Sequence, residues 1–288
     1  MAGLAQLELL GFAVVADEPA ELGRTIAAIT GRPDALQSPD RSVGVYPVGD
    51  RVIAAVPPAA ATGLPHELAR STSGIVAITL AVPNLDAATA RLVSYGHEVR
   101  WNTAPIVPVG LGARRAFVPG LLKSTALALE LVEQAPRAYA RNDAAAITEV
   151  VYATADADGA CAEMADALGL EVGPEVLQAQ PPEQIRFRNA YAGERPILCL
   201  IEPANDNSAV ARFLARRGQS FYSVIIRVPD LQAAVDRLRL AGLQLLVDGD
   251  SFVEGTRSGA RSIDRAALNW VRPGPATGRI LFELQQFS

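Results

Sequence analysis

The sequence contains few of the side chains that usually bind metals or carry redox chemistry. Its only cysteines are Cys161 and Cys199, and no CxxC pair exists for a zinc or redox site. Its only histidines are His66 and His97, and neither belongs to an HxH or HExxH spacing. A disulfide framework is excluded, and a mechanism that depends on histidine is not expected.

Lysine is also scarce, and acidic residues outnumber basic ones. The formal net charge is -5, and Lys123 is the single lysine. Because phosphate binding usually needs a concentrated basic face, this balance argues against a nucleic-acid partner. No apolar run is long enough to span a bilayer, and the first residues lack the basic region of a signal peptide. The sequence therefore predicts a cytoplasmic protein with no membrane partner.

Nucleotide-binding motifs are missing too. No GxGxxG follows a strand-like segment, and no GxxxxGK[ST] occurs. The main alternative fold, a doubly wound α/β sheet, would need about one helix per strand and parallel-type apolar strands throughout. Turn signals such as Val48-Gly49-Asp50 instead indicate hairpins.

An internal repeat organises the chain. Residues 82–96 read VPNLDAATARLVSYG, and residues 228–242 read VPDLQAAVDRLRLAG. Their prolines and their terminal glycines are both 146 positions apart. In each copy an apolar strand runs into proline, a helix with apolar residues at helical spacing follows, and a glycine ends the helix.

Two weaker copies share this order of strand, turn, helix, glycine and strand. They read LLGFAVVADEPAELGRTIAAITG and ITEVVYATADADGACAEMADALGLEV. Each half also ends on an apolar strand with a Glu-Leu pair, at Glu130 and Glu283. The sequence therefore predicts an α+β fold of four βαβββ modules, at about residues 5–58, 74–134, 145–203 and 218–288.

The four modules are expected to pair into two cup-shaped half-barrel domains. The first would comprise residues 1–134 and be structural, and the second would comprise residues 145–288 and hold the ligand site. The segment QAPRAYARNDAA, rich in polar and small residues, is the expected linker.

The C-terminal half resembles methylmalonyl-CoA epimerase and its relatives in the glyoxalase, or vicinal-oxygen-chelate, superfamily. The likeness spans about residues 147–286 and is densest in LCLIEPANDNSAVARFLARRGQSFYSVIIRVPDLQAAVDRLRLAGLQLL. The ending ALNWVRPGPATGRILFEL resembles that family's last hairpin and final strand. The N-terminal half matches only the general pattern of the module.

The resemblance implies where a metal would be bound. Carried over one at a time, the first His ligand falls on Glu149, the Gln-type ligand on Cys199, the second His on Ser223 and the final Glu on Glu283. Only Glu283 keeps the family's residue. Because a Ser hydroxyl is a poor ligand for transition metals, neither a metal nor another cofactor is expected.

The N-terminal half has fewer polar candidates. Its equivalent positions are Leu10, Ala54, Ala77 and Glu130, and three of these four side chains cannot coordinate a metal.

Glu149 and Glu283 form the predicted catalytic pair. Two carboxylates that face one substrate would remove and return a proton, and their mutual repulsion would raise one pKa toward neutrality. The alternatives are that Glu149 starts a strand in solvent and that Glu283 is a carboxylate at the mouth of the cup bonded to an arginine.

Further residues are predicted to contact the substrate. Arg186 and Arg188 alternate along IRFRNAY and so share one face of a strand, which is turned either to solvent or to the cup. Trp270 would stack on a ring or belong to the core. The predicted substrate-binding set is Cys199, Tyr222, Ser223, Arg186, Arg188 and Trp270.

Three functions remain open. The first is a metal-independent isomerase, epimerase or lyase that acts on a small carbonyl-bearing or aromatic substrate. The second is a non-catalytic small-molecule binding protein of the drug-sequestering type. The third, an extradiol-type dioxygenase, needs two His and one Glu, and the chain supplies only the Glu at these positions. Formation of a homodimer is left open.

Overall fold

The chain is described from a computed structural model. The described residues are 7–32, 36–37, 43–58, 74–101, 105–107, 113–121, 127–133, 145–178, 184–193, 195–246, 253–256 and 265–287. His66 and all of the predicted linker except Ala145 lie outside these ranges.

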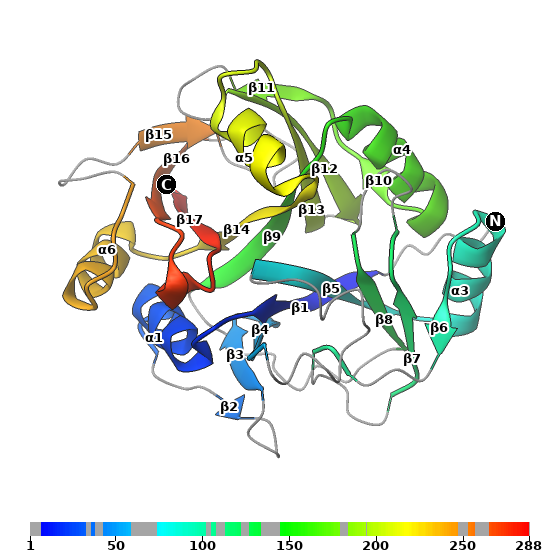
Figure 1. Cartoon of the computed structure of the whole chain (residues 1–288), viewed down its shortest axis with the longest axis horizontal. Coiled ribbons are helices and arrows are strands. Elements are labelled where there is room, and N and C mark those ends of the chain that lie inside the picture. The colour runs from blue at the N-terminus through cyan, green and yellow to red at the C-terminus, as the bar shows by residue number, and fades with distance from the viewer. Residues whose placement is uncertain are drawn as a thin grey trace.

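The N-terminal half forms one sheet and two described helices (Figure 1). The helices are α1 (Pro19–Thr30) and α3 (Leu85–Ser94). The strands are β1 (Glu8–Val15), β2 (Leu36–Gln37), β3 (Gly44–Val48), β4 (Arg51–Val56), β5 (Gly74–Val82), β6 (Arg100–Trp101), β7 (Arg115–Val118) and β8 (Leu129–Glu133).

The C-terminal half forms a second sheet in the same way. Its helical segments are α4 (Ala157–Leu168), α5 (Ala209–Arg217), α6 (Leu231–Leu240) and the short 3-10 helix η2 (Pro275–Thr277). Its strands are β9 (Ala146–Ala153), β10 (Glu171–Val172), β11 (Val176–Gln178), β12 (Ile185–Ala192), β13 (Arg195–Pro203), β14 (Ser220–Arg227), β15 (Val253–Thr256), β16 (Arg265–Val271) and β17 (Leu281–Phe287).

The two sheets have the same topology. Their strand orders are β2-β3-β4-β1-β5-β8-β7-β6 and β10-β12-β13-β9-β14-β17-β16-β15. Each module contributes a first strand that pairs parallel with its own last strand, and the two first strands of a half pair antiparallel at the centre of the sheet. The predicted α+β fold of four βαβββ modules is confirmed, and the doubly wound alternative is wrong because most ladders are antiparallel.

The internal repeat marks equivalent places in the two sheets. Helices α3 and α6 begin at Leu85 and Leu231, and each is capped by the side chain of the preceding residue, Asn84 or Asp230. Gly96 and Gly242 follow these helices with φ of 85° and 74°, a left-handed conformation that glycine adopts without steric cost.

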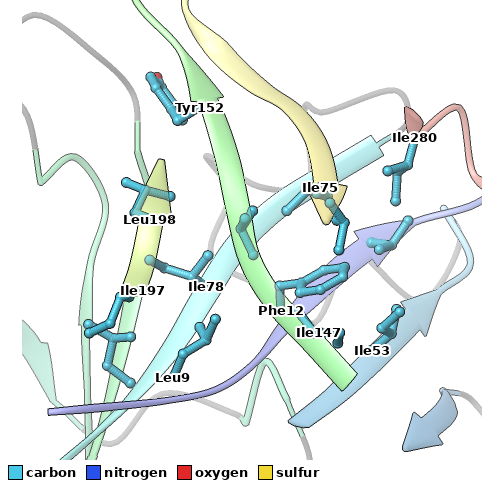
Figure 2. Packing of buried hydrophobic residues seen from close by; sticks show 14 of the residues in the cluster. Leu9, Phe12, Ile53, Ile75, Ile78, Ile147, Tyr152, Ile197, Leu198 and Ile280 are labelled. Carbon is cyan, nitrogen blue, oxygen red and sulfur yellow. The ribbon is translucent and has the colours of Figure 1, made fainter. Parts of the chain in front are cut away.

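A shared hydrophobic core lies between the two sheets. It combines one face of the first sheet, including Phe12 and Ile78, with one face of the second, including Ile147 and Leu198. Figure 2 shows these side chains where the strands of the two halves cross. Since side chains alternate along a strand, the opposite face of each sheet is turned away from this core and forms the inside of its own cup.

Helices also connect the halves. Helix α1 packs on α6 at one end of the core, and α3 packs on α4 at the other. Each sheet belongs to one half, but one core serves both sheets, so the division into domains 1–134 and 145–288 stays a proposal. Among the described residues, no helix is both long enough and apolar enough to cross a membrane.

Gly11 provides a test of how tightly β1 and β4 pack. A Cβ atom at Gly11 would lie 2.1 Å from the carbonyl oxygen of Val52, whereas one at Gly274 would meet nothing within 4 Å. We expect Gly11→Ala to lower the free energy of unfolding by about 2 kcal/mol or more, because backbone must move to relieve the overlap. Gly274→Ala is the control, with an expected change within about 0.5 kcal/mol. Urea unfolding measures both, and equal effects would contradict the close approach.

Candidate active site

Glu149 and Glu283 lie in one row across the cup face of the C-terminal sheet. In the strand register, Glu149 of β9 is opposite Ile225 of β14, Ile225 is opposite Glu283 of β17, and Glu283 is opposite Trp270 of β16. Residues paired in this way have side chains on the same face. At an interstrand spacing of about 4.8 Å, the two glutamate Cα atoms are about 10 Å apart.

A second row runs beside the first. Cys199 of β13 pairs with Val151 of β9, and Val151 pairs with Ser223 of β14. Both Cys199 and Ser223 are buried. The structure thus brings four of the predicted site positions, Glu149, Cys199, Ser223 and Glu283, to one face of four adjacent strands.

Most of the remaining lining is apolar. One cluster, which contains Val151 and Cys199, is covered by Val210, Phe213 and Leu214 of helix α5. A second cluster contains Leu268, Trp270 and Leu281 around the half-buried Tyr222. Tyr222 packs edge-on against the Phe213 ring, with ring centroids 5.0 Å apart, and so joins the two clusters.

The carboxyl group of Glu283 sits in this apolar surrounding. Its Oε1 accepts a hydrogen bond of 2.8 Å from Nε2 of Gln285, and the Trp270 side chain also lowers its pKa. Burial outweighs both contacts and raises the pKa of Glu283 above its ordinary value. The rise was predicted, but its main cause is burial rather than repulsion by Glu149. The alternative of an arginine partner is not observed among the described residues.

Glu149 is fully buried, so the alternative of a solvent-exposed strand start is wrong. It follows a β-bulge, because the pairing of β9 with β14 steps from Ile147 to Glu149 and leaves Thr148 as an extra residue. The guanidinium of Arg51 binds the carbonyl oxygens of Ile147 and Thr148 at 3.1 and 2.6 Å.

The donor set does not suit a metal. A divalent cation in this cup would meet the oxygens of Glu149 and Glu283, the sulfur of Cys199 and the hydroxyl of Ser223, which match no single metal preference. In the part of the chain that the structure describes, no three His, Cys, Asp or Glu residues gather as a metal-binding group. We therefore derive no chemistry through a metal.

The N-terminal cup has the same frame with different residues. Its β1 has a bulge at Leu10, so the position equivalent to Glu149 is Gly11, opposite Thr79, and not Leu10 as predicted. The same bulge occurs at Thr148 in β9, so it does not change the count between the halves, and the prediction misaligned the two weak repeat copies by one residue. Ala54 and Ala77 hold the positions predicted for them, since both pair with Ala13.

The carboxylate of this cup, Glu130, is neutralised within the half. It forms an ion pair with Arg115, Nη1 to Oε1 at 2.9 Å, and both side chains are buried. Its oxygens also accept hydrogen bonds from the Thr79 hydroxyl and from the backbone N–H groups of Ile106 and Val107, at 2.7, 3.0 and 3.3 Å. Ile106 and Val107 pack inside the cup, so the chain fills this cup itself.

Arg186 and Arg188 do not belong to the site. Both point to the face opposite Phe187, because neighbouring residues of a strand alternate. Arg186 pairs with Glu202 at 2.9 Å, and Arg188 pairs with Asp158 of α4 at 2.5 Å. The prediction that they contact substrate is wrong, and the alternative of an outward face is correct.

Two residues near the site were not predicted. Gln285 lies two positions after Glu283 on the same face and is fully buried, so strand alternation alone could have identified it. Arg51 comes from the other half of the chain, and no local pattern links it to Glu149. His97 is buried far from the cup, at the junction of the halves, with Nε2 3.7 Å from Oε1 of Glu163.

Comparison with known proteins identifies the fold of the C-terminal half. Residues 148–263 match the model of the Glyoxalase/Bleomycin resistance protein/Dioxygenase superfamily. A comparison with curated proteins found no match.

Some solved structures resemble about half of the chain, and others resemble nearly all of it. Methylmalonyl-CoA epimerase from Mycobacterium tuberculosis is 27% identical over 49% of this chain and 87% of its own, with a TM-score of 0.42. A mutant of 4-hydroxymandelate synthase from Streptomyces coelicolor is 15% identical over 98% of this chain and 92% of its own, with a TM-score of 0.67. A fusion protein of a xylose isomerase-like TIM barrel with 4-hydroxyphenylpyruvate dioxygenase is 17% identical over 97% of this chain and 49% of its own, with a TM-score of 0.64. The last two likenesses concern the four-module fold alone.

Two neighbouring arginines test the role of the buried ion pair. Arg115→Met leaves Glu130 buried without its cation, so we expect the free energy of unfolding to fall by about 3–5 kcal/mol. Arg114 pairs with Asp86 in solvent, and we expect Arg114→Met to have a much smaller effect. Urea unfolding of both variants is the measurement. Comparable losses would show that the Glu130 network is not a structural anchor.

The raised pKa of Glu283 predicts a pH-dependent stability. The folded protein holds the proton more tightly than the unfolded chain, so stability is highest below the unfolded-state pKa and falls as pH rises toward the folded-state pKa. Glu283→Gln removes the titrating carboxyl group and with it this pH dependence of the free energy of unfolding. The variant should therefore gain stability relative to the natural protein as pH rises. The gain should approach about 1.4 kcal/mol per pH unit inside that window. A difference between the two proteins that stays constant from pH 4 to 8 would refute it.

Proposed function

We propose that the C-terminal cup binds a small carbonyl-bearing or aromatic molecule and acts on it as a metal-independent isomerase, epimerase or lyase. The match of residues 148–263 to the model of the Glyoxalase/Bleomycin resistance protein/Dioxygenase superfamily supports this proposal. The single observation that carries this proposal is the row of Glu149 and Glu283, two carboxyl groups on one apolar cup face with only Ile225 between them.

The environments of the two carboxyl groups suit different roles. Burial raises the pKa of Glu283, which favours its protonated form as the general acid. Glu149 is the proposed general base, and it interacts electrostatically with the buried guanidinium of Arg51.

The proposed reaction is a proton transfer at a carbon next to a carbonyl group. The carboxylate of Glu149 takes the proton, and the electron pair of the broken C–H bond moves to the carbonyl oxygen as an enolate. The carboxylic acid of Glu283 then returns a proton to the same carbon from the other side. The product is the inverted isomer, and exchange with water restores both groups.

A non-catalytic binding protein is the alternative function. It is favoured by the apolar and aromatic lining, in which Trp270, Tyr222 and Phe213 present rings and side-chain carbon to a ligand. A dioxygenase is disfavoured, because the positions that would hold two histidines are Glu149 and Ser223.

The proposal is tested by proton exchange. Methylmalonyl-CoA and 4-hydroxyphenylpyruvate, whose C–H groups lie next to carbonyls, are incubated with the protein in D2O, and loss of the C–H signal is followed by NMR. We expect enzyme-dependent exchange of at least one probe, and Glu149→Gln or Glu283→Gln should each slow it about a hundredfold. Glu175→Gln, which changes a carboxylate 44% exposed on the outer face, is the matched control.

Two outcomes would count against the enzyme. Full exchange activity in both glutamine variants would show that the pair takes no part in the chemistry. Absence of exchange, combined with calorimetric binding of a probe that is equal in the natural protein and both variants, would support the binding-protein alternative.

A further inference from the structure

We propose that Arg51, which belongs to the N-terminal half, is a positioning residue for Glu149 in the C-terminal cup. This role rests on the proposed function of Glu149, whereas the contacts of Arg51 are observed independently of that function. If it is correct, the N-terminal half does more than support the fold, because the site is incomplete without its β3–β4 hairpin.

The turn of the hairpin packs against the starts of two adjacent strands of the other sheet, β9 and β13. Val48 pairs with Arg51 across the turn formed by Gly49 and Asp50. A Cβ atom on Gly49 would lie 3.1 Å from the Cβ of Ala146, at the start of β9. Asp50 forms an ion pair of 2.5 Å with Arg195, the first residue of β13. The turn therefore contacts both strands that flank the base of the cup.

Arg51 makes the innermost contact of this hairpin. Its side chain is buried, and its guanidinium donates to the carbonyl oxygens of Ile147, Thr148 and Pro196, at 3.1, 2.6 and 3.4 Å. Buried carbonyl groups need such partners, since an unpaired one costs the free energy of a lost hydrogen bond. A guanidinium can satisfy several acceptors at once because its donors form a rigid fork.

Two of the carbonyl groups that Arg51 binds, those of Ile147 and Thr148, belong to the β-bulge that directly precedes Glu149. Thr148 is the extra residue between β9 and β14, and its carbonyl belongs to the peptide group that Glu149 completes. Bulges change the direction of the adjacent side chain and interrupt the ladder. Two donors hold this one: the Thr148 hydroxyl, which donates to the carbonyl oxygen of Ile225 at 3.2 Å, and the Arg51 guanidinium. By holding both carbonyls, Arg51 sets the orientation of the Glu149 peptide and thereby of its side chain.

The charge of Arg51 acts in the same direction. Burial lowers the pKa of Arg51 to about 10, so it stays charged near neutral pH, and the charges that face it are those of Asp50, Arg195, Glu149 and Glu8. Coulombic attraction between Arg51 and Glu149 favours the ionised carboxylate that a general base requires.

The test separates this role from simple stabilisation. Arg51→Lys keeps the positive charge but loses the planar set of guanidinium N–H donors, and Arg51→Met loses both. Asp50→Asn is the matched control, since it removes the neighbouring ion pair with Arg195 and leaves the guanidinium in place. The full chain is labelled with 13C-glutamate, Glu149 is assigned from the spectrum of Glu149→Gln, and its carboxyl signal is followed against pH.

We expect the proton affinity of Glu149 to rise about threefold or more in Arg51→Met and to change little in Asp50→Asn. Both Arg51 variants should lower kcat for probe exchange about tenfold or more, with KM nearly unchanged and with Arg51→Lys retaining more activity than Arg51→Met. If Arg51→Met does not fold, Arg51→Lys carries the test through its loss of kcat and through a shift of the Glu149 carboxyl signal at fixed pH.

The outcomes are distinguishable. An unchanged Glu149 signal and unchanged kcat in Arg51→Lys, with loss of activity in Glu149→Gln, would overturn the role of Arg51 and leave the proposed function standing. A shifted Glu149 signal in the Arg51 variants, with full activity in Glu149→Gln, would support the positioning role and refute the proposed chemistry. Equal effects of Asp50→Asn and Arg51→Lys on the signal would also overturn the proposal, because the hairpin as a whole would then be responsible.

Discussion

Burial of one face of each sheet in a common core is the constraint on which the rest of the structure depends. Phe12 and Ile78 of one half pack with Ile147 and Leu198 of the other, so neither sheet presents that face to water. Because side chains alternate along a strand, the residues between the core-facing ones point to the opposite face of the sheet, which lines the cup. A shift of one residue would exchange core and cup side chains, which is why the bulges at Leu10 and Thr148 matter so much.

The two cups show how one frame carries two different interiors. In the first, Glu130 meets Arg115, Thr79 and two backbone N–H groups, and the chain fills the space with Ile106 and Val107. In the second, the register places Leu268 where the first cup has Arg115, and Ile225 where it has Thr79.

These replacements explain why the two carboxyl groups behave differently. Glu130 has a buried cation and so forms a structural network. Among the described residues, Glu283 meets the amide of Gln285 and the side chain of Trp270, and burial raises its pKa. The same strand position therefore stabilises the fold in one half, and in the other it holds a carboxyl group suited to binding or exchanging a proton.

The sequence by itself determined the modules and the faces of their strands. The constant spacing from Pro83 to Pro229 identified equivalent helices, and the Glu-Leu pairs located Glu130 and Glu283 on equivalent strands. These features are local, because helix caps, glycine ends and strand alternation each depend on a few neighbouring residues. The same alternation placed Arg186 and Arg188 together but could not say which face they occupy.

Only the tertiary structure decided what surrounds each candidate. It put Arg186 and Arg188 outside, because Glu202 and Asp158 are on that side of β12. It moved the counterpart of Glu149 from Leu10 to Gly11, because strand pairing fixes the alignment of two weak repeat copies that share too few residues to be aligned by sequence alone. It also brought Arg51 to the carbonyl oxygens of Ile147 and Thr148, across almost a hundred residues of sequence, because packing of the two sheets places a hairpin of one half against the starts of two strands of the other. Contacts of that kind follow from how whole elements pack, and no pattern of neighbouring residues encodes them.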